Sequence, residues 1–151
     1  MYSNLKKGYF KYQQTDVLSM SNVEIVERLL KAMCSDIERA AFYMKNGDVA
    51  KKGERLSRAI AIAGELQASL NFKEGGEIAE RLNSLYDYMI RELLMANLKN
   101  DVKRLGNVKA TLMPIIEAWQ GVVQQNCNRS NHVSEVHHET NEPVGQLQTA
   151  L

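Results

Sequence analysis

Residues 74–96 read EGGEIAERLNSLYDYMIRELLMA, and this stretch decides the fold. The paired glycines at its start predict a tight turn, and a helix is expected directly after them. From Ile78 to Ala96 apolar residues recur at three- and four-residue spacing, which is typical of one buried face of an amphipathic helix. The pattern therefore predicts a helix over residues 77–99.

The same periodicity recurs in three further stretches, residues 21–46, 49–70 and 102–125. Short connections between such helices imply antiparallel neighbours. We predict an all-α fold, an antiparallel up-down four-helix bundle. Core positions expected from the spacing include Val26, Leu29, Met33, Ile37, Val49, Leu56, Ile78, Leu82, Leu85, Leu93, Leu105, Leu112 and Trp119.

Polar residues and glycines mark the predicted helix ends. Ser21 and Glu24 have the spacing of a capping box, in which each side chain binds a free amide of the other residue. Asn46 or Gly47 suits the left-handed conformation that ends a helix. Asp48 and Asp101 are the expected caps of the second and fourth helices.

Both ends of the chain lack this periodicity. Residues 1–20 contain several aromatic side chains, which favours an arm that packs on the bundle over a disordered leader. Residues 126–151 are polar, and we expect a disordered tail there. Within the last helix, Pro114 predicts a kink or a weakened turn near Ala110 and Thr111, because proline lacks an amide hydrogen.

The composition excludes several classes of protein. Charged residues make up 25% of the chain and leave a formal net charge of +1, whereas a nucleic-acid-binding protein normally shows a clear basic excess. No apolar run approaches the ~20 residues of a membrane span. Cys34 and Cys127 are far apart and are expected to be free thiols in a reducing cytoplasm.

The chain also lacks a convincing catalytic or metal-binding pattern. The single Glu-x-x-His pair, Glu135 and His138, lies in the predicted tail rather than on an inward-facing helix. Cys127 and the tail histidines have suitable ligand atoms but no zinc-site spacing. We expect no catalytic residue, no metal and no cofactor, and therefore not an enzyme.

The helices carry more apolar residues than one buried face requires. One reading is that the additional residues are core margins and scattered surface positions. The other is a groove for an amphipathic segment of a second protein. Under that reading the candidate binding residues are Ile25, Ile62, Leu66, Tyr88, Ile90, Leu94 and Met95.

Several motifs together resemble the family of flagellin-specific export chaperones. YFKYQQTDV at residues 9–17 resembles the Tyr-x-x-Tyr-Lys-Gln-x-x-Val opening of that family, and SNVEIV at residues 21–26 resembles the start of its first helix. The long block from NGDVAKKG through EGGEIAERLNSLYDYMI, residues 46–90, is the most specific part. ANLKND and the EAW that contains Trp119 complete the resemblance, which covers about residues 9–122.

The resemblance implies a cytosolic four-helix bundle that binds the C-terminal region of flagellin. Such a chaperone prevents premature polymerisation and supports delivery to the flagellar type III export apparatus. Tyr9, Tyr12 and Val17 fall on the family pattern, and we expect them to anchor the N-terminal arm on the bundle. The alternative function is a helical adaptor or regulator that binds another flagellar or secretion protein. A homodimer is also possible, because an empty groove can pair with a second copy.

Overall fold

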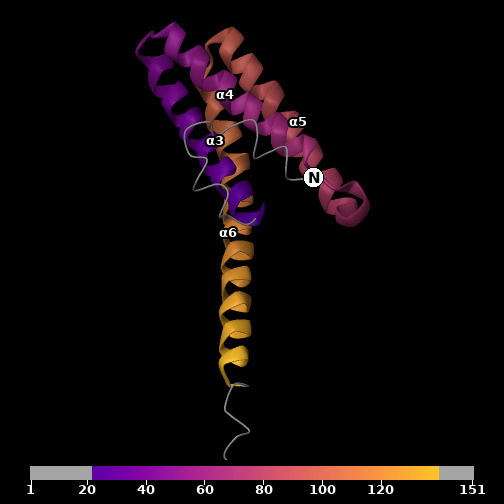
Figure 1. Cartoon of the computed structure of the whole chain (residues 1–151). Helices are drawn as coiled ribbons and strands as arrows, with labels where there is room; N and C mark the ends of the chain where they lie inside the picture. The colour runs from indigo at the N-terminus through magenta and orange to yellow at the C-terminus, as the bar shows by residue number, and fades with distance from the viewer. Residues whose placement is uncertain (1–21, 140–151) are drawn as a thin grey trace, which may run out of the picture.

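The computed structural model describes residues 22–139, and it describes side chains as far as residue 131. It contains the helices α3 (Asn22–Lys45), α4 (Val49–Ala68), α5 (Phe72–Lys99) and α6 (Val102–Glu139) (Figure 1). No strand occurs in this part of the chain. The predicted all-α four-helix bundle is confirmed.

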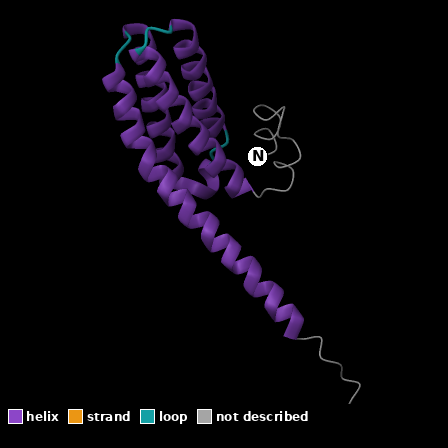
Figure 2. Cartoon of the chain, turned by 90° about the vertical axis from the view of Figure 1, so that its left-hand side faces the viewer, coloured by secondary structure: helices purple, strands orange, loops and turns teal. Residues whose placement is uncertain are grey.

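The helices form a closed ring. α3 packs against α4 and α6, and α5 packs against the same two helices. The α3–α4 and α5–α6 connections lie together at one end of the bundle, which we call the loop end (Figure 2). The connections are short, at residues 46–48, 69–71 and 100–101, so neighbours in the sequence run antiparallel.

The predicted ends of the helices follow from local chemistry. Gly47 has a φ of 72°, in the left-handed region that glycine adopts without steric cost. Asp48 Oδ1 accepts the amide hydrogen of Lys51 at 3.1 Å, which confirms its role as a cap. Asp101 Oδ1 accepts the amide hydrogen of Lys103 at 3.0 Å in the same way. Ser21 lies outside the described residues, so the capping box stays a prediction.

The glycine turn at the start of α5 is more elaborate than predicted. Gly76 has a φ of 47° and a ψ of −124°, and this non-helical residue separates a first helical turn from the rest of α5. That first turn begins at Phe72, where Asn71 Oδ1 accepts the amide hydrogen of Glu74 at 3.1 Å. The long part of α5 starts after Gly76, in agreement with the predicted boundary at residue 77.

α6 is longer than predicted. The helix continues to Glu139, so the boundary predicted at residue 125 is wrong, and α6 extends past the other helices (Figures 1 and 2). Residues 124–131 are exposed, which explains why apolar periodicity gave no sign of this segment. The helix is also continuous through Pro114. The remainder of the predicted tail, residues 140–151, lies outside the described residues.

The core contains most of the residues expected from the spacing. Its largest fully enclosed side chains include Leu29, Met33, Ile37, Leu56, Tyr86, Met89, Leu93 and Leu105. Three core predictions are wrong: Val49 is 70% exposed, Ile78 is 71% exposed and Leu85 is 36% exposed. The periodicity identifies the face of a helix that points inward, but it does not show whether another helix covers that face.

Polar contacts between the helices fix their alignment. Asp36 of α3 pairs with Arg55 and Arg58 of α4, at 3.1 and 3.6 Å. Gln67 of α4 donates to Asn83 and Asp87 of α5, at 2.9 and 2.7 Å. These contacts hold three successive helices in one register.

Candidate functional site

An apolar groove lies between the first half of α5 and the middle of α6. Its volume is about 470 Å³. The residues that line it share apolar side chains: Ile78, Leu82, Pro114, Ile115, Ala118, Trp119 and Val122. A groove with this lining offers the kind of surface on which the apolar face of an amphipathic helix binds.

Part of the groove lining belongs to the edge of the core, where no helix covers it completely. Leu82 and Trp119 pack against the core but are only partly buried. Ile78 and Val122 are 71% and 39% exposed. The long part of α5 begins just after Gly76, whereas α6 continues past this point and beyond the bundle (Figure 1). Neighbouring exposed apolar side chains of this kind mark a binding surface more often than scattered ones do.

Three of the predicted binding residues do not contribute exposed surface. Ile25, Ile62 and Leu66 are 1%, 0% and 2% exposed and belong to the core. The expectations that Ile62 and Leu66 widen the face of the second helix beyond the core, and that Ile25 lies at the margin of the first, are therefore wrong. In the ring of four helices, α3 and α4 each have two neighbours, so their apolar faces must be wide.

The remaining predicted residues all lie on α5, along its two edges. Glu92, which pairs with Arg104 of α6, marks one edge, and Tyr88 and Met95 lie one turn from it. Asp87, which binds Gln67 of α4, marks the other edge, near Ile90 and Leu94.

Their exposure differs along these edges. Leu94 is 51% exposed, whereas Tyr88, Ile90 and Met95 are partly buried. Contact of these residues with a second protein stays a prediction. The predicted arm anchors Tyr9, Tyr12 and Val17 lie outside the described residues.

Sequence reasoning missed the groove because it assigned three of the lining residues to the core and gave the others no role in binding. Ile78, Leu82 and Trp119 follow the same periodicity as fully buried Leu93. The glycine pair at 75 and 76 was a usable signal for the groove. A turn at this position interrupts α5, and α5 then no longer covers the apolar face of the neighbouring helix α6.

The two thiols differ in environment. Cys34 is buried and Cys127 is exposed, and both are free. Burial raises the pKa of the Cys34 thiol, the carboxylate of Glu38 raises it further, and Lys109 opposes the shift. Cys34 therefore stays protonated at neutral pH and behaves as a small apolar core residue.

The described part of the chain contains no cluster of three or more histidine, cysteine or acidic residues that could hold a metal ion. Within that same range, no helix is both long enough and apolar enough to cross a membrane.

A helical bundle with an open apolar groove has the kind of surface on which an amphipathic segment of another chain docks. The sequence model of the family described as "Flagellar protein FliS" matches residues 5–126. The chain therefore belongs to the FliS family of flagellar export chaperones, which are not enzymes.

Individual relatives agree with this assignment. The chain is 44% identical to the flagellar secretion chaperone FliS of Salmonella typhimurium over 110 residues, which cover 72% of this chain and 82% of that protein. It is 36% identical to FliS of Escherichia coli over 119 residues, 76% of this chain and 88% of that protein. It is 32% identical to FliS of Bacillus subtilis over 120 residues, 80% of this chain and 89% of that protein.

Proposed function

We propose that this export chaperone acts in the cytosol and binds the C-terminal segment of flagellin. Binding prevents premature polymerisation and supports delivery of flagellin to the flagellar type III export apparatus. The observation that carries the proposal is the apolar groove between α5 and α6 in a member of the FliS family. The groove has the lining that an amphipathic helix of a client needs.

The proposed mechanism is competition for apolar helix faces. Subunits of a helical filament assemble by burying such faces against one another, and a face that lies in the groove is not available for assembly. Burial of one large aliphatic side chain contributes about 1.5–3 kcal/mol. Ordering a flexible client segment costs about 2–5 kcal/mol, so the net affinity is moderate. Moderate affinity allows the export apparatus to remove the client.

The client contact is proposed to extend from the groove along α5. Tyr88 and Met95 lie on the edge of α5 that faces α6, the same pair of helices that forms the groove. Ile90 and Leu94 lie on the edge that faces α4. A client segment reaches all four residues only if it crosses α5, so contact with Ile90 and Leu94 requires a longer segment than contact with the groove.

The proposal is tested by titrating the chain with the C-terminal peptide of flagellin from the same organism. Trp119 is the only tryptophan and lines the groove, so its fluorescence reports occupancy directly. We expect Ile78→Ser and Val122→Ser each to weaken binding about tenfold, because each removes an apolar contact from the groove. Both residues are exposed, so the melting temperature is expected to change little.

Val49→Ser is the matched control. Val49 is 70% exposed, as Ile78 is, but it lies at the first residue of α4, far from the groove. Normal binding by both groove variants would overturn the groove assignment. The double variant Tyr88→Ala and Met95→Ala tests the extension of the client contact along α5. We expect it to weaken binding of the same flagellin peptide. A pull-down that recovers another flagellar or secretion protein in place of flagellin would favour the adaptor function.

A further inference from the structure

A second pocket lies at the loop end, distant from the groove. Its volume is about 220 Å³, and it is formed by the end of α3, the start of α4 and the end of α5. Leu98 at this pocket and Ile78 at the groove are both on α5, and the rise of a helix places them ~30 Å apart. The two surfaces are therefore separate.

A buried ammonium group lines this pocket. Lys52 is only 6% exposed, and its Nζ donates to the carbonyl oxygen of Asn97 and to Oδ1 of Asn100, both at 3.2 Å. Both acceptors are uncharged, so neither neutralises the positive charge. An ammonium group has three donors, and these two bonds use two of them. The pocket therefore offers a hydrogen-bond donor and a positive charge to a ligand.

Four lysines lie near the helix ends at the loop end, and the helix dipole accounts for only two of them. Lys45 and Lys99 lie in the last turns of α3 and α5, where a positive charge complements the helix dipole. Lys51 and Lys103, by contrast, lie in the first turns of α4 and α6, where the dipole disfavours positive charge, and neither first turn has an acidic residue.

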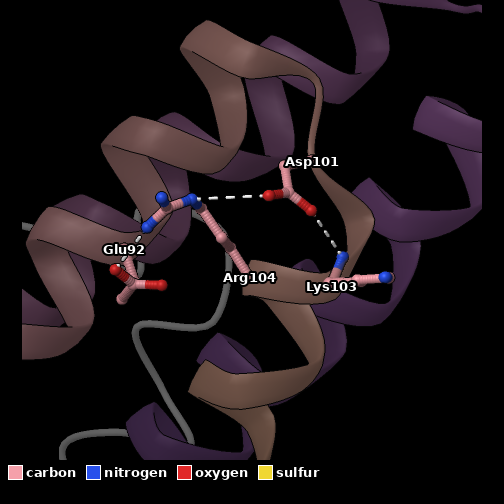
Figure 3. A network of polar contacts seen from close by, with 4 residues as sticks. All are labelled: Glu92, Asp101, Lys103 and Arg104. Carbon is pink, nitrogen blue, oxygen red and sulfur yellow. Dashed lines mark hydrogen bonds and ion pairs between the residues drawn. The ribbon is translucent and has the colours of Figure 1, made fainter.

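The acidic residues nearby already have partners. Asp48 is itself one of the residues that line the pocket, but its carboxylate caps α4 and lies 3.4 Å from Lys51 Nζ. Asp101 caps α6 and lies 3.5 Å from Arg104, whose guanidinium also binds Glu92 at 2.6 Å (Figure 3). The loop end thus has a local positive excess in a chain whose formal net charge is only +1.

Exposed apolar side chains lie beside these charges. Val49 and Leu98 line the pocket and are 70% and 79% exposed. Phe42 is 62% exposed and makes an edge contact with the ring of Tyr43, over which Lys51 Nζ lies at 5.5 Å. We define the loop-end patch as Phe42, Tyr43, Val49, Lys51, Lys52 and Leu98.

We propose that the loop-end patch binds an acidic segment of a partner protein that also carries a large apolar side chain. A carboxylate enters the pocket and accepts the remaining hydrogen bond of Lys52, and the apolar side chain covers Val49 and Leu98. Charge complementarity selects this occupant, because a hydrogen bond from an ammonium to a carboxylate is stronger than one to a neutral oxygen. A client segment that occupies the groove alone leaves the patch free, whereas one that extends along α5 to Leu94 would lie within one turn of Leu98.

Other anionic partners fit the patch less well. Lys52 lies inside a small pocket and is almost fully buried, so the charge is reached by a projecting side chain rather than by a flat lipid surface. A nucleic-acid surface requires an extended basic stripe, whereas the positive charges here surround apolar side chains.

The test is an NMR titration of the full 15N-labelled chain with the capped hexapeptide Asp-Glu-Leu-Phe-Asp-Glu. The comparison peptide has asparagine and glutamine in place of the acids. We expect shift changes at residues 43–52 and 97–103, and affinity that falls as salt concentration rises. The neutral peptide is expected to bind at least tenfold more weakly. Equal binding of both peptides, or shift changes confined to the groove, would overturn the proposal.

Variants assign the contacts. Lys52→Met retains the aliphatic stem and removes the charge, and Leu98→Ser removes an apolar contact. Each is expected to weaken binding of the acidic peptide about tenfold, whereas Ile78→Ser in the groove leaves it unchanged. Leu98 is exposed, so Leu98→Ser provides the test even if Lys52→Met destabilises the end of α5. Normal binding by Leu98→Ser, or binding to phosphatidylglycerol vesicles without binding to the peptide, would contradict the proposal.

Discussion

Asp36 is 2% exposed on a helix whose other buried residues are apolar, apart from the thiol of Cys34. A carboxylate removed from water is tolerated only when partners compensate its charge. Arg55 and Arg58 reach it from α4, one turn apart, and their own side chains stay 20% and 35% exposed. The partly hydrated arginines make the arrangement less costly than a fully buried pair, and they align α3 with α4.

We predict that Asp36→Ala lowers the free energy of unfolding by about 2–3 kcal/mol, because both guanidinium groups lose their carboxylate and the site loses its packing. Urea denaturation followed by circular dichroism measures the change. Glu77→Ala is the control: Glu77 pairs with Arg81, but both side chains are about three-quarters exposed, at 74% and 76%. An ion pair this exposed contributes little. Equal effects of the two substitutions would show that the Asp36 pair does not stabilise the bundle.

At the scale of the helix, α5 shows how a local break shapes the surface beside it. Gly76 interrupts the helix, and Ile78 follows it within a turn, at the rim of the groove. The interruption changes the direction of the chain where α4 connects to α5. Near Gly76 the long part of α5 stops covering the apolar face of α6, and the groove lies at this position.

Gly76→Ala is expected to destabilise the fold by about 1–2 kcal/mol, since a Cβ atom disfavours the backbone at φ 47° and ψ −124°. Gly106→Ala provides the comparison. Gly106 lies inside α6, where an added methyl group would meet no other side chain within 4 Å, and alanine is the better helix former there. Gly106→Ala is expected to stabilise by about 0.5–1 kcal/mol. Thermal unfolding of both variants checks the opposite signs, and a stabilising Gly76→Ala would contradict the assigned turn.

At the scale of the whole molecule, the bundle and the end of α6 have different roles. Four helices share one core, whereas α6 continues beyond them (Figure 2). Its residues 124–131 are exposed, and helical segments of this length gain little stability without packing. We therefore expect the ring of helices, rather than the length of α6, to determine the stability of the fold.

Deletion of residues 132–151 is predicted to change the free energy of unfolding by less than about 0.5 kcal/mol. Helical ellipticity should fall because part of α6 is removed. Denaturation of the full and shortened chains gives both quantities. A clear loss of stability would mean that the deleted segment packs against the bundle. Unchanged flagellin-peptide affinity in the shortened chain would further separate the segment from the proposed client site.

Local sequence patterns specify the helices, their inward faces and most of their ends. These features are local: Asp48 and Asp101 bind amides two or three residues away, and Gly47 and Gly76 adopt backbone conformations that favour glycine. The core positions of Leu29, Met33 and Leu93 follow from the period of the helix. The exposed end of α6 carried no such signal, because it has no apolar face to repeat.

Which apolar faces are covered follows from the packing of the helices and not from the pattern within one of them. Ile25 and Ile62 looked additional to the core yet are enclosed, whereas Ile78 follows the core spacing yet is exposed. Burial depends on whether another helix lies opposite a face, and periodicity within one helix contains no information about that neighbour. The groove and the loop-end patch both bring together residues from different helices, so they exist only once the helices are packed.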